Sequence, residues 1–116
     1  MELAEFLLAR IAEDEDAAKG VHRGTWTSRV ALLPGDLYGH IVRQHPQRVL
    51  AECEAKRLLV RWHDTVDYAG GCAACGEPAP CHHLRYLALP YASHLDFDPD
   101  WSLETQNAAR QSPCED

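Results

Sequence analysis

Residues 63–83 read HDTVDYAGGCAACGEPAPCHH and bring together side chains that bind transition metals. Within this stretch Cys72 and Cys75 form a Cys-x-x-Cys pair, and Cys81 follows after five intervening residues. Two cysteines at this spacing can place both thiolates on one tetrahedral zinc ion, about 2.3 Å from each sulfur. The pattern therefore predicts a Zn²⁺ site with Cys72, Cys75 and Cys81 as ligands.

The residues around the Cys-x-x-Cys pair favour a tight metal-binding turn. Gly70 and Gly71 precede the pair, and Gly76 follows it. Glycine adopts positive φ readily and lets backbone amides approach the sulfur atoms. Pro78 and Pro80 then stiffen the return of the chain to the third cysteine.

Histidines on both sides of the cysteines compete for the fourth position around the ion. His63 ends a predicted helix, whereas His82 and His83 directly follow Cys81. Adjacent residues rarely bind one ion because their side chains diverge, so His82 is the weakest candidate. We favour His63, which would give one ligand at a helix end, two on the turn and one at the start of the next helix. His83 is the alternative, and a donor from solvent or a partner comes third.

Other chemistries of paired cysteines fit this chain less well. A thioredoxin-like dithiol lies within a βαβ unit, and the sequence shows no such unit. Disulfides are disfavoured because the chain has five cysteines, an odd number, and no signal peptide. An iron–sulfur cluster usually needs four cysteines, and Cys53 falls in an apolar helical pattern that predicts a core position instead.

The composition indicates a small globular protein without a membrane partner. Its 116 residues suffice for one domain with a modest core, and no apolar run approaches membrane-spanning length. The first ten residues, MELAEFLLAR, lack signal-peptide features, so we expect a cytoplasmic location, where thiolates stay reduced. The formal net charge of −7 disfavours nonspecific binding to nucleic acid.

Hydrophobic periodicity predicts a mainly α fold with about three helices. These are expected at residues 2–19, 46–64 and 79–92, with the zinc knuckle joining the last two. Residues 21–39 have strand-like composition around Trp26 and predict a short β-hairpin or extended segment across the helices.

The chain after the last predicted helix reads SHLDFDPDW over residues 93–101. Its alternating oxygen donors suggest a second metal site, but the glycine and glutamate of a calcium loop are absent. We expect Phe97 and Trp101 to fold back onto the helices instead. Residues 102–116 are polar and acidic and predict a disordered tail, which leaves a single domain over residues 1–101.

Three stretches carry a resemblance to a known family: FLLARIAEDE at 6–15, HPQRVLAECEAKRLLVRWH at 45–63 and PCHHLRYLALPYASHLDFDPDW at 80–101. Together with the Cys-x-x-Cys pair, they resemble a family of small actinobacterial and actinophage proteins that carry a domain of unknown function. The resemblance covers residues 3–101, nearly the whole chain.

The resemblance bears on the metal site but implies no activity. In the family pattern the two positions after the last cysteine are not usually histidine, which implies His63 as the fourth ligand rather than His82 or His83. The chain departs from the pattern at Leu95, where proline is more usual, so the turn there is expected to differ.

The favoured function is that of a non-enzymatic, zinc-stapled helical protein that docks on another protein. Four sulfur and nitrogen ligands leave no open position for water, and the sequence shows no nucleophile–base pair or phosphate loop. Nucleic-acid binding is the alternative, through four cations: Lys56, Arg57, Arg61 and Arg85. A metalloenzyme or thiol redox sensor comes third, because it would need an open zinc position or thiols of low pKa.

Overall fold

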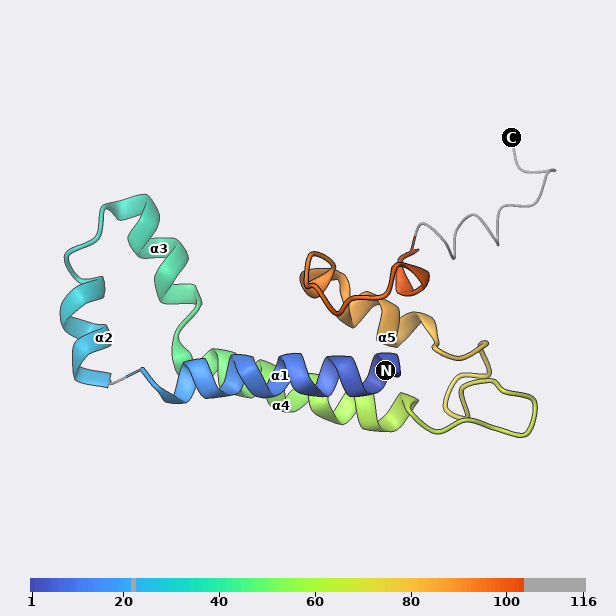
Figure 1. The fold of residues 1–116 in the computed structure, drawn as a ribbon. Helices are drawn as coiled ribbons and strands as arrows, with labels where there is room; N and C mark the ends of the chain where they lie inside the picture. The colour runs from blue at the N-terminus through green and yellow to red at the C-terminus, as the bar shows by residue number, and fades with distance from the viewer. Residues whose placement is uncertain (22, 104–116) are drawn as a thin grey trace. The chain divides into compact units, whose positions relative to one another are not determined.

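The computed structural model describes residues 1–21 and 23–103, and it is built from helices (Figure 1). In chain order the elements are α1 (Leu3–Lys19), α2 (Arg23–Val30), α3 (Gly35–Arg43), α4 (Pro46–His63), α5 (His82–Leu87) and the 3₁₀ helices η1 (Leu89–Tyr91) and η2 (Pro99–Trp101). The described residues contain no β-sheet, and their β-pairing is limited to two isolated bridges between α4 and α5. The predicted mainly α class is confirmed, but three helices was too low a number.

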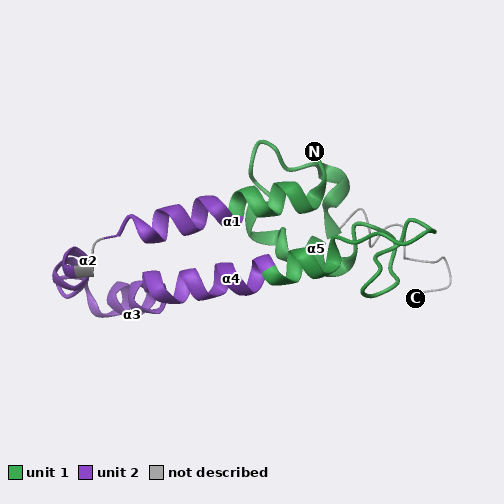
Figure 2. Ribbon diagram, turned by 90° about the horizontal axis from the view of Figure 1, so that it is seen from below, with its two compact units in different colours: residues 1–10, 58–116 green, residues 11–57 purple. Residues whose placement is uncertain are grey.

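The chain divides into two compact units (Figure 2). The first contains residues 1–10 and the chain from residue 58 onward, and the second contains residues 11–57. α1 and α4 therefore each contribute residues to both units. The cysteine-rich stretch belongs to the first unit. Most of the predicted tail, residues 104–116 with Cys114, lies outside the described residues.

In the unit of residues 11–57 an ion pair joins α1 to α4. The Arg57 guanidinium donates two hydrogen bonds to the Glu15 carboxylate, one from Nη1 to Oε2 at 2.9 Å and one from Nη2 to Oε1. Both side chains are largely covered, with 19% of Arg57 and 15% of Glu15 exposed. Ile11 and Cys53 are buried nearby along the same two helices, which confirms the core position predicted for Cys53.

The β-hairpin or extended segment expected over residues 21–39 is wrong, because most of the described residues there lie in α2 and α3. Side chains around Trp26 favour strands, but a lone strand would leave its N–H and C=O groups without partners. A helix pairs these groups internally, and the Ser28 hydroxyl also donates to the Gly24 carbonyl at 2.9 Å. Trp26 is half-buried and meets the His45 ring edge-on, with centroids 5.5 Å apart.

The unit that contains residues 1–10 is organised around the ring of Phe6, which is fully buried. Four aromatic side chains contact it with ring centroids 5.2–6.4 Å away: Tyr91, His94, Phe97 and Trp101. Most of these contacts are edge-to-face, the arrangement that aromatic rings prefer. The prediction that Phe97 and Trp101 fold back onto the helices is therefore confirmed.

The last predicted helix, over residues 79–92, is shorter in the structure. α5 covers six residues, and the chain then tightens into the 3₁₀ turn η1. Pro90 lies in η1, because proline has no N–H with which to continue an α-helix. Cys81 has an extended backbone, with φ −73° and ψ 170°, and forms the N-cap of α5. The third cysteine thus stands at the junction of loop and helix.

Candidate metal centre

His63 is the last residue of α4 and carries its side chain into the core of its unit. The residue is 4% exposed, and Val60, three positions earlier on the same helix face, is fully buried. The imidazole contacts the rings of Trp62 and His83, at centroid distances of 4.7 Å and 4.1 Å. The end of α4 therefore presents a buried imidazole toward the chain that follows.

The loop between α4 and α5 is held by its own backbone hydrogen bonds. Cys72 pairs with Val66 in an antiparallel bridge, and its N–H donates to the Glu77 carbonyl at 2.6 Å. Gly76, with φ +77°, donates its N–H to the Cys72 carbonyl at 2.7 Å and closes the Cys-x-x-Cys turn. Gly70 also has a positive φ, of +83°. These two glycines supply the left-handed conformations that the sequence predicted.

Gly71 has a different role, together with an aspartate that the sequence reasoning missed. Asp67 Oδ1 accepts hydrogen bonds from the N–H groups of Ala69 and Gly71, both at 2.9 Å. A Cβ on Gly71 would lie 3.3 Å from Asp67 Oδ2 and 3.2 Å from the Glu77 carbonyl oxygen. The absence of a Cβ on Gly71 thus allows the Asp67 carboxylate and the Glu77 carbonyl to lie close to its backbone. An aspartate three residues before a glycine pair is compatible with this kind of turn, because its side chain can accept hydrogen bonds from the backbone that follows.

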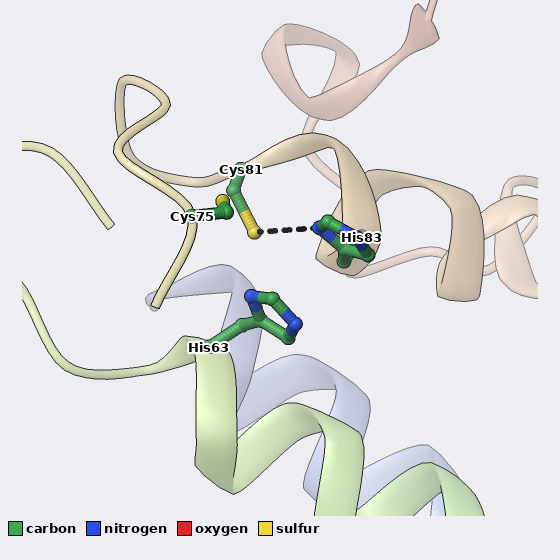
Figure 3. Close-up of side chains that lie close together, drawn as sticks. All are labelled: His63, Cys75, Cys81 and His83. Atoms are coloured by element: carbon green, nitrogen blue, oxygen red, sulfur yellow. Dashed lines mark hydrogen bonds between the residues drawn. The ribbon is translucent and has the colours of Figure 1, made fainter. Parts of the chain in front are cut away.

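The structure brings four potential ligands together: His63, Cys75, Cys81 and His83 (Figure 3). One donor atom from each lies within 4.8 Å of the others. The Cys81 sulfur is 3.9 Å from Nδ1 of His83. Two sulfurs and two imidazole nitrogens are donors that zinc binds in structural sites. The end of α4, the loop and the start of α5 thus meet at a cluster that can hold a metal ion.

Cys72, predicted as a ligand, is not a member of that group of four but adjoins it. Its sulfur lies 3.4 Å from Nδ1 of His63, and the residue is 1% exposed. Burial acts to raise the pKa of the Cys72 thiol, but the N–H groups of Cys75 and Ala74 and the side chains of Cys75 and Cys81 outweigh it and lower the pKa. Cys72 is therefore the thiol whose surroundings favour the thiolate, the form that binds metal.

Cys81 behaves in the opposite way. Burial raises the pKa of its thiol to about 11, although the amides of Leu84 and His83 oppose the rise. The neighbouring Cys72 adds to the rise, because two thiolates side by side repel each other. Ionising both sulfurs together is thus unfavourable in the protein alone, and a bound divalent cation would remove that penalty.

The two ring nitrogens of His63 have different surroundings. Nδ1 faces the Cys72 sulfur, whereas Nε2 is buried without a hydrogen-bond partner in the described part of the chain. Burial, helped by His83, lowers the pKa of His63, which favours the neutral imidazole that binds metals. No hydrogen bond among the described residues accounts for burying Nε2, and a buried neutral imidazole beside thiols fits a metal ligand.

His82, the weakest candidate by sequence, lies outside the group of four. Its Nδ1 pairs with a carboxylate oxygen of Glu77, and its ring lies near that of Tyr86. The imidazole is buried, 9% exposed, through contacts of its own. Adjacent histidines at the start of α5 are thus directed to different partners, as side chains one residue apart on a helix diverge.

Two of the cations considered for nucleic-acid binding make contacts within the chain. Arg57 binds Glu15, as described above. Arg85 donates from Nε to the Pro80 carbonyl at 3.0 Å and from Nη1 to the Asp100 carbonyl at 2.8 Å. The Arg57 guanidinium thus links α4 to α1, and the Arg85 guanidinium links α5 to the chain on either side of it.

The oxygen-rich segment after α5 also has local roles. Nη1 of Arg10 lies 3.0 Å from Nδ1 of His94 and 3.9 Å from a carboxylate oxygen of Asp96. Asp98 accepts a hydrogen bond from the Asp100 N–H at 2.9 Å and caps η2. These contacts anchor the segment to α1 and start its 3₁₀ turn.

Comparison with known proteins places the chain in a family without assigning an activity. A family model matches residues 1–103. The chain belongs to DUF6221, a family of unknown function. This agrees with the resemblance to a domain of unknown function. No curated protein and no solved structure matched the chain. Among the described residues, no helix is both long enough and apolar enough to cross a bilayer.

Proposed function

We propose that this protein is a non-enzymatic zinc-binding module in which a structural ion ties α4, the loop and α5 together. Three ligands are His63, Cys75 and Cys81, and the fourth is Cys72 or His83. The observation that carries the proposal is that donors from three separate segments meet. The donor atoms of His63, Cys75, Cys81 and His83 all lie within 4.8 Å of one another. The Cys72 sulfur lies 3.4 Å from Nδ1 of His63.

Zinc is the ion that this donor set favours. Thiolates and imidazoles are soft or borderline ligands, which bind zinc in preference to magnesium or calcium. A site filled by four protein ligands has no position for a reactive water, which supports a structural rather than a catalytic ion. Reduced thiolates are also compatible with the cytoplasm, the location that we propose.

Exposed apolar side chains beside the site support a protein partner. Trp62, next to His63, is 63% exposed, and Tyr86 on α5 is 54% exposed. Aromatic side chains at the surface are typical of protein interfaces. Because the intrachain contacts of Arg57 and Arg85 occupy two of the candidate cations, we place nucleic-acid binding second. A thiol sensor comes third, and an actinobacterial or phage origin is inferred from the sequence resemblance alone.

Elemental analysis of the purified full chain tests the ion. We expect about one zinc per chain, and substitution of both Cys75 and Cys81 by serine should remove it. The matched control is Cys53→Ser, since Cys53 is a buried cysteine in the other unit and its loss should leave the metal content unchanged. A chain purified without metal, or with iron and visible absorbance, would refute the zinc proposal.

A further inference from the structure

The site offers more donors than a tetrahedral ion can use. His63, Cys75, Cys81 and His83 form the mutually close group, and Cys72 stands 3.4 Å from His63 Nδ1. Structural zinc is almost always four-coordinate. Five sulfur and nitrogen donors therefore compete for four positions, and one is in surplus.

Cys72 has the features of a built-in ligand. It is 1% exposed, and the Cys-x-x-Cys turn directs the amides of Ala74 and Cys75 at its sulfur. Amide donors around a ligand sulfur fix its position and stabilise it as a thiolate. The loop backbone holds this sulfur in place, since the Cys72 N–H and C=O are bonded to Glu77 and Gly76.

His83 has the features of an exchangeable ligand. It is exposed, unlike the buried His63, and its ring lies flat against the His63 ring, with planes 13° apart and centroids 4.1 Å apart. Its Nδ1 reaches within 3.9 Å of Cys81 Sγ. A stacked ring at the surface can turn toward or away from the cluster without unfolding the loop.

We propose that Cys72 and His83 are alternative fourth ligands of one ion, which His63, Cys75 and Cys81 hold in both states. This inference rests on the proposed function, because it requires an ion at this site. In the exchange, the bond from the metal to the Cys72 sulfur breaks and the sulfur leaves as a thiolate, while a bond from the metal to the neutral His83 imidazole forms. The surface of α5 is thereby linked to the buried ion.

Titration of Zn²⁺ and Co²⁺ into the reduced full chain tests the exchange. Cys72→Ser and His83→Ala should each bind one ion with affinity within about tenfold of wild type, because the other donor fills the position. The double variant should bind on the order of 100-fold more weakly than either single variant. His82→Ala is the control and should match wild type.

The Co²⁺ complexes give a second readout that does not depend on affinity. The sulfur-to-metal charge-transfer absorbance should be larger in His83→Ala, with three thiolates, than in Cys72→Ser, with two. Loss of binding in either single variant alone would overturn the proposal, as would a double variant no weaker than the singles, or equal absorbance in the two. A wild-type chain that binds neither metal would instead refute the proposed function itself.

Discussion

His63 and His82 are both buried histidines beside the cysteines, yet their side chains contact different partners. His63 presents Nδ1 to the Cys72 sulfur, and its other nitrogen is buried without a partner in the described part of the chain. His82 pairs with Glu77 instead. The same residue type, at similar burial, thus lies in the candidate metal cluster in one case and contacts a carboxylate in the other.

The first prediction follows from this contrast. His63→Ala should weaken zinc binding by about 100-fold or more, because it removes a ligand that both alternative sets require. His82→Ala should retain about one zinc per chain, although it loses the contact with Glu77. Competition with a chromophoric chelator measures both affinities. Equal losses in the two variants would contradict the assignment of His63.

At the scale of elements, the Glu15–Arg57 pair ties α1 to α4 within the unit of residues 11–57. The hydrogen bonds from Arg57 lower the pKa of Glu15 from its usual 4.5. A carboxyl with a lowered pKa in the folded state stabilises the fold above pH 4.5, and this contribution is lost as the pH falls through the lowered value. The reason is that the Glu15 carboxyl binds a proton more tightly in the unfolded chain than in the folded one, so acidification favours unfolding.

We therefore predict that Glu15→Gln lowers the melting temperature at pH 7 and flattens the loss of stability on acidification below pH 4.5. The control is Asp16→Asn, which removes the same charge one residue later on α1. Asp16 is exposed and makes no ion pair in the described part of the chain. Thermal melts monitored by circular dichroism from pH 3 to pH 7 compare them. Identical pH profiles for wild type and Glu15→Gln would show that the pair contributes nothing.

The aromatic cluster around Phe6 gives a further prediction at this scale. Phe6→Ala should destabilise the protein by about 3–5 kcal/mol, the usual cost of emptying a buried phenylalanine site. Leu95→Ala is the control from the segment that covers Phe6, because Leu95 is 98% exposed. Urea denaturation of the zinc-loaded chain measures both free energies. A loss below about 1 kcal/mol for Phe6→Ala would mean that the cluster is not the core of its unit.

At the scale of the whole molecule, a bound metal ion would stabilise the two units to different extents. The loop of residues 64–80 contains few buried apolar side chains, whereas ordering each residue costs roughly 1–2 kcal/mol. Structural zinc supplies on the order of 10 kcal/mol of apparent binding free energy. The second unit, residues 11–57, has its own ion pair and buried side chains and none of the proposed ligands.

Removal of the metal should therefore affect the molecule unevenly. On chelation we predict that helical circular dichroism falls moderately, that residues 64–83 become sensitive to protease, and that amide exchange in residues 46–57 of α4 changes little. Limited proteolysis and hydrogen exchange, both read by mass spectrometry, locate the change. Re-addition of zinc should restore protection. If the loop stays protected without metal and the melting temperature is unchanged, the structural role of zinc is wrong, and a redox or catalytic role of the thiols is favoured instead.

What the sequence determined by itself depends on short-range spacing. The 3.6-residue periodicity of α1 and α4 reports one buried face along a single helix, so both elements could be predicted to within a residue or two. The Cys-x-x-Cys turn with its glycines is likewise local, since Gly70 and Gly76 adopt positive φ within the loop. The folding back of Phe97 and Trp101 was also predictable, because large apolar rings after a helix-ending proline must find cover.

The tertiary structure alone decided which partners distant side chains find. Residues 23–30 have strand-like composition, but no neighbouring strand offers hydrogen bonds in the described structure, so they form α2. Glu77 came within reach of His82 only when the loop folded back on itself. His83 came within reach of His63 because Cys81 ends the loop and starts α5, which sets the direction of the next two side chains. Proximity across separate segments depends on helix orientation and loop path, and neither is encoded in the spacing of any one motif.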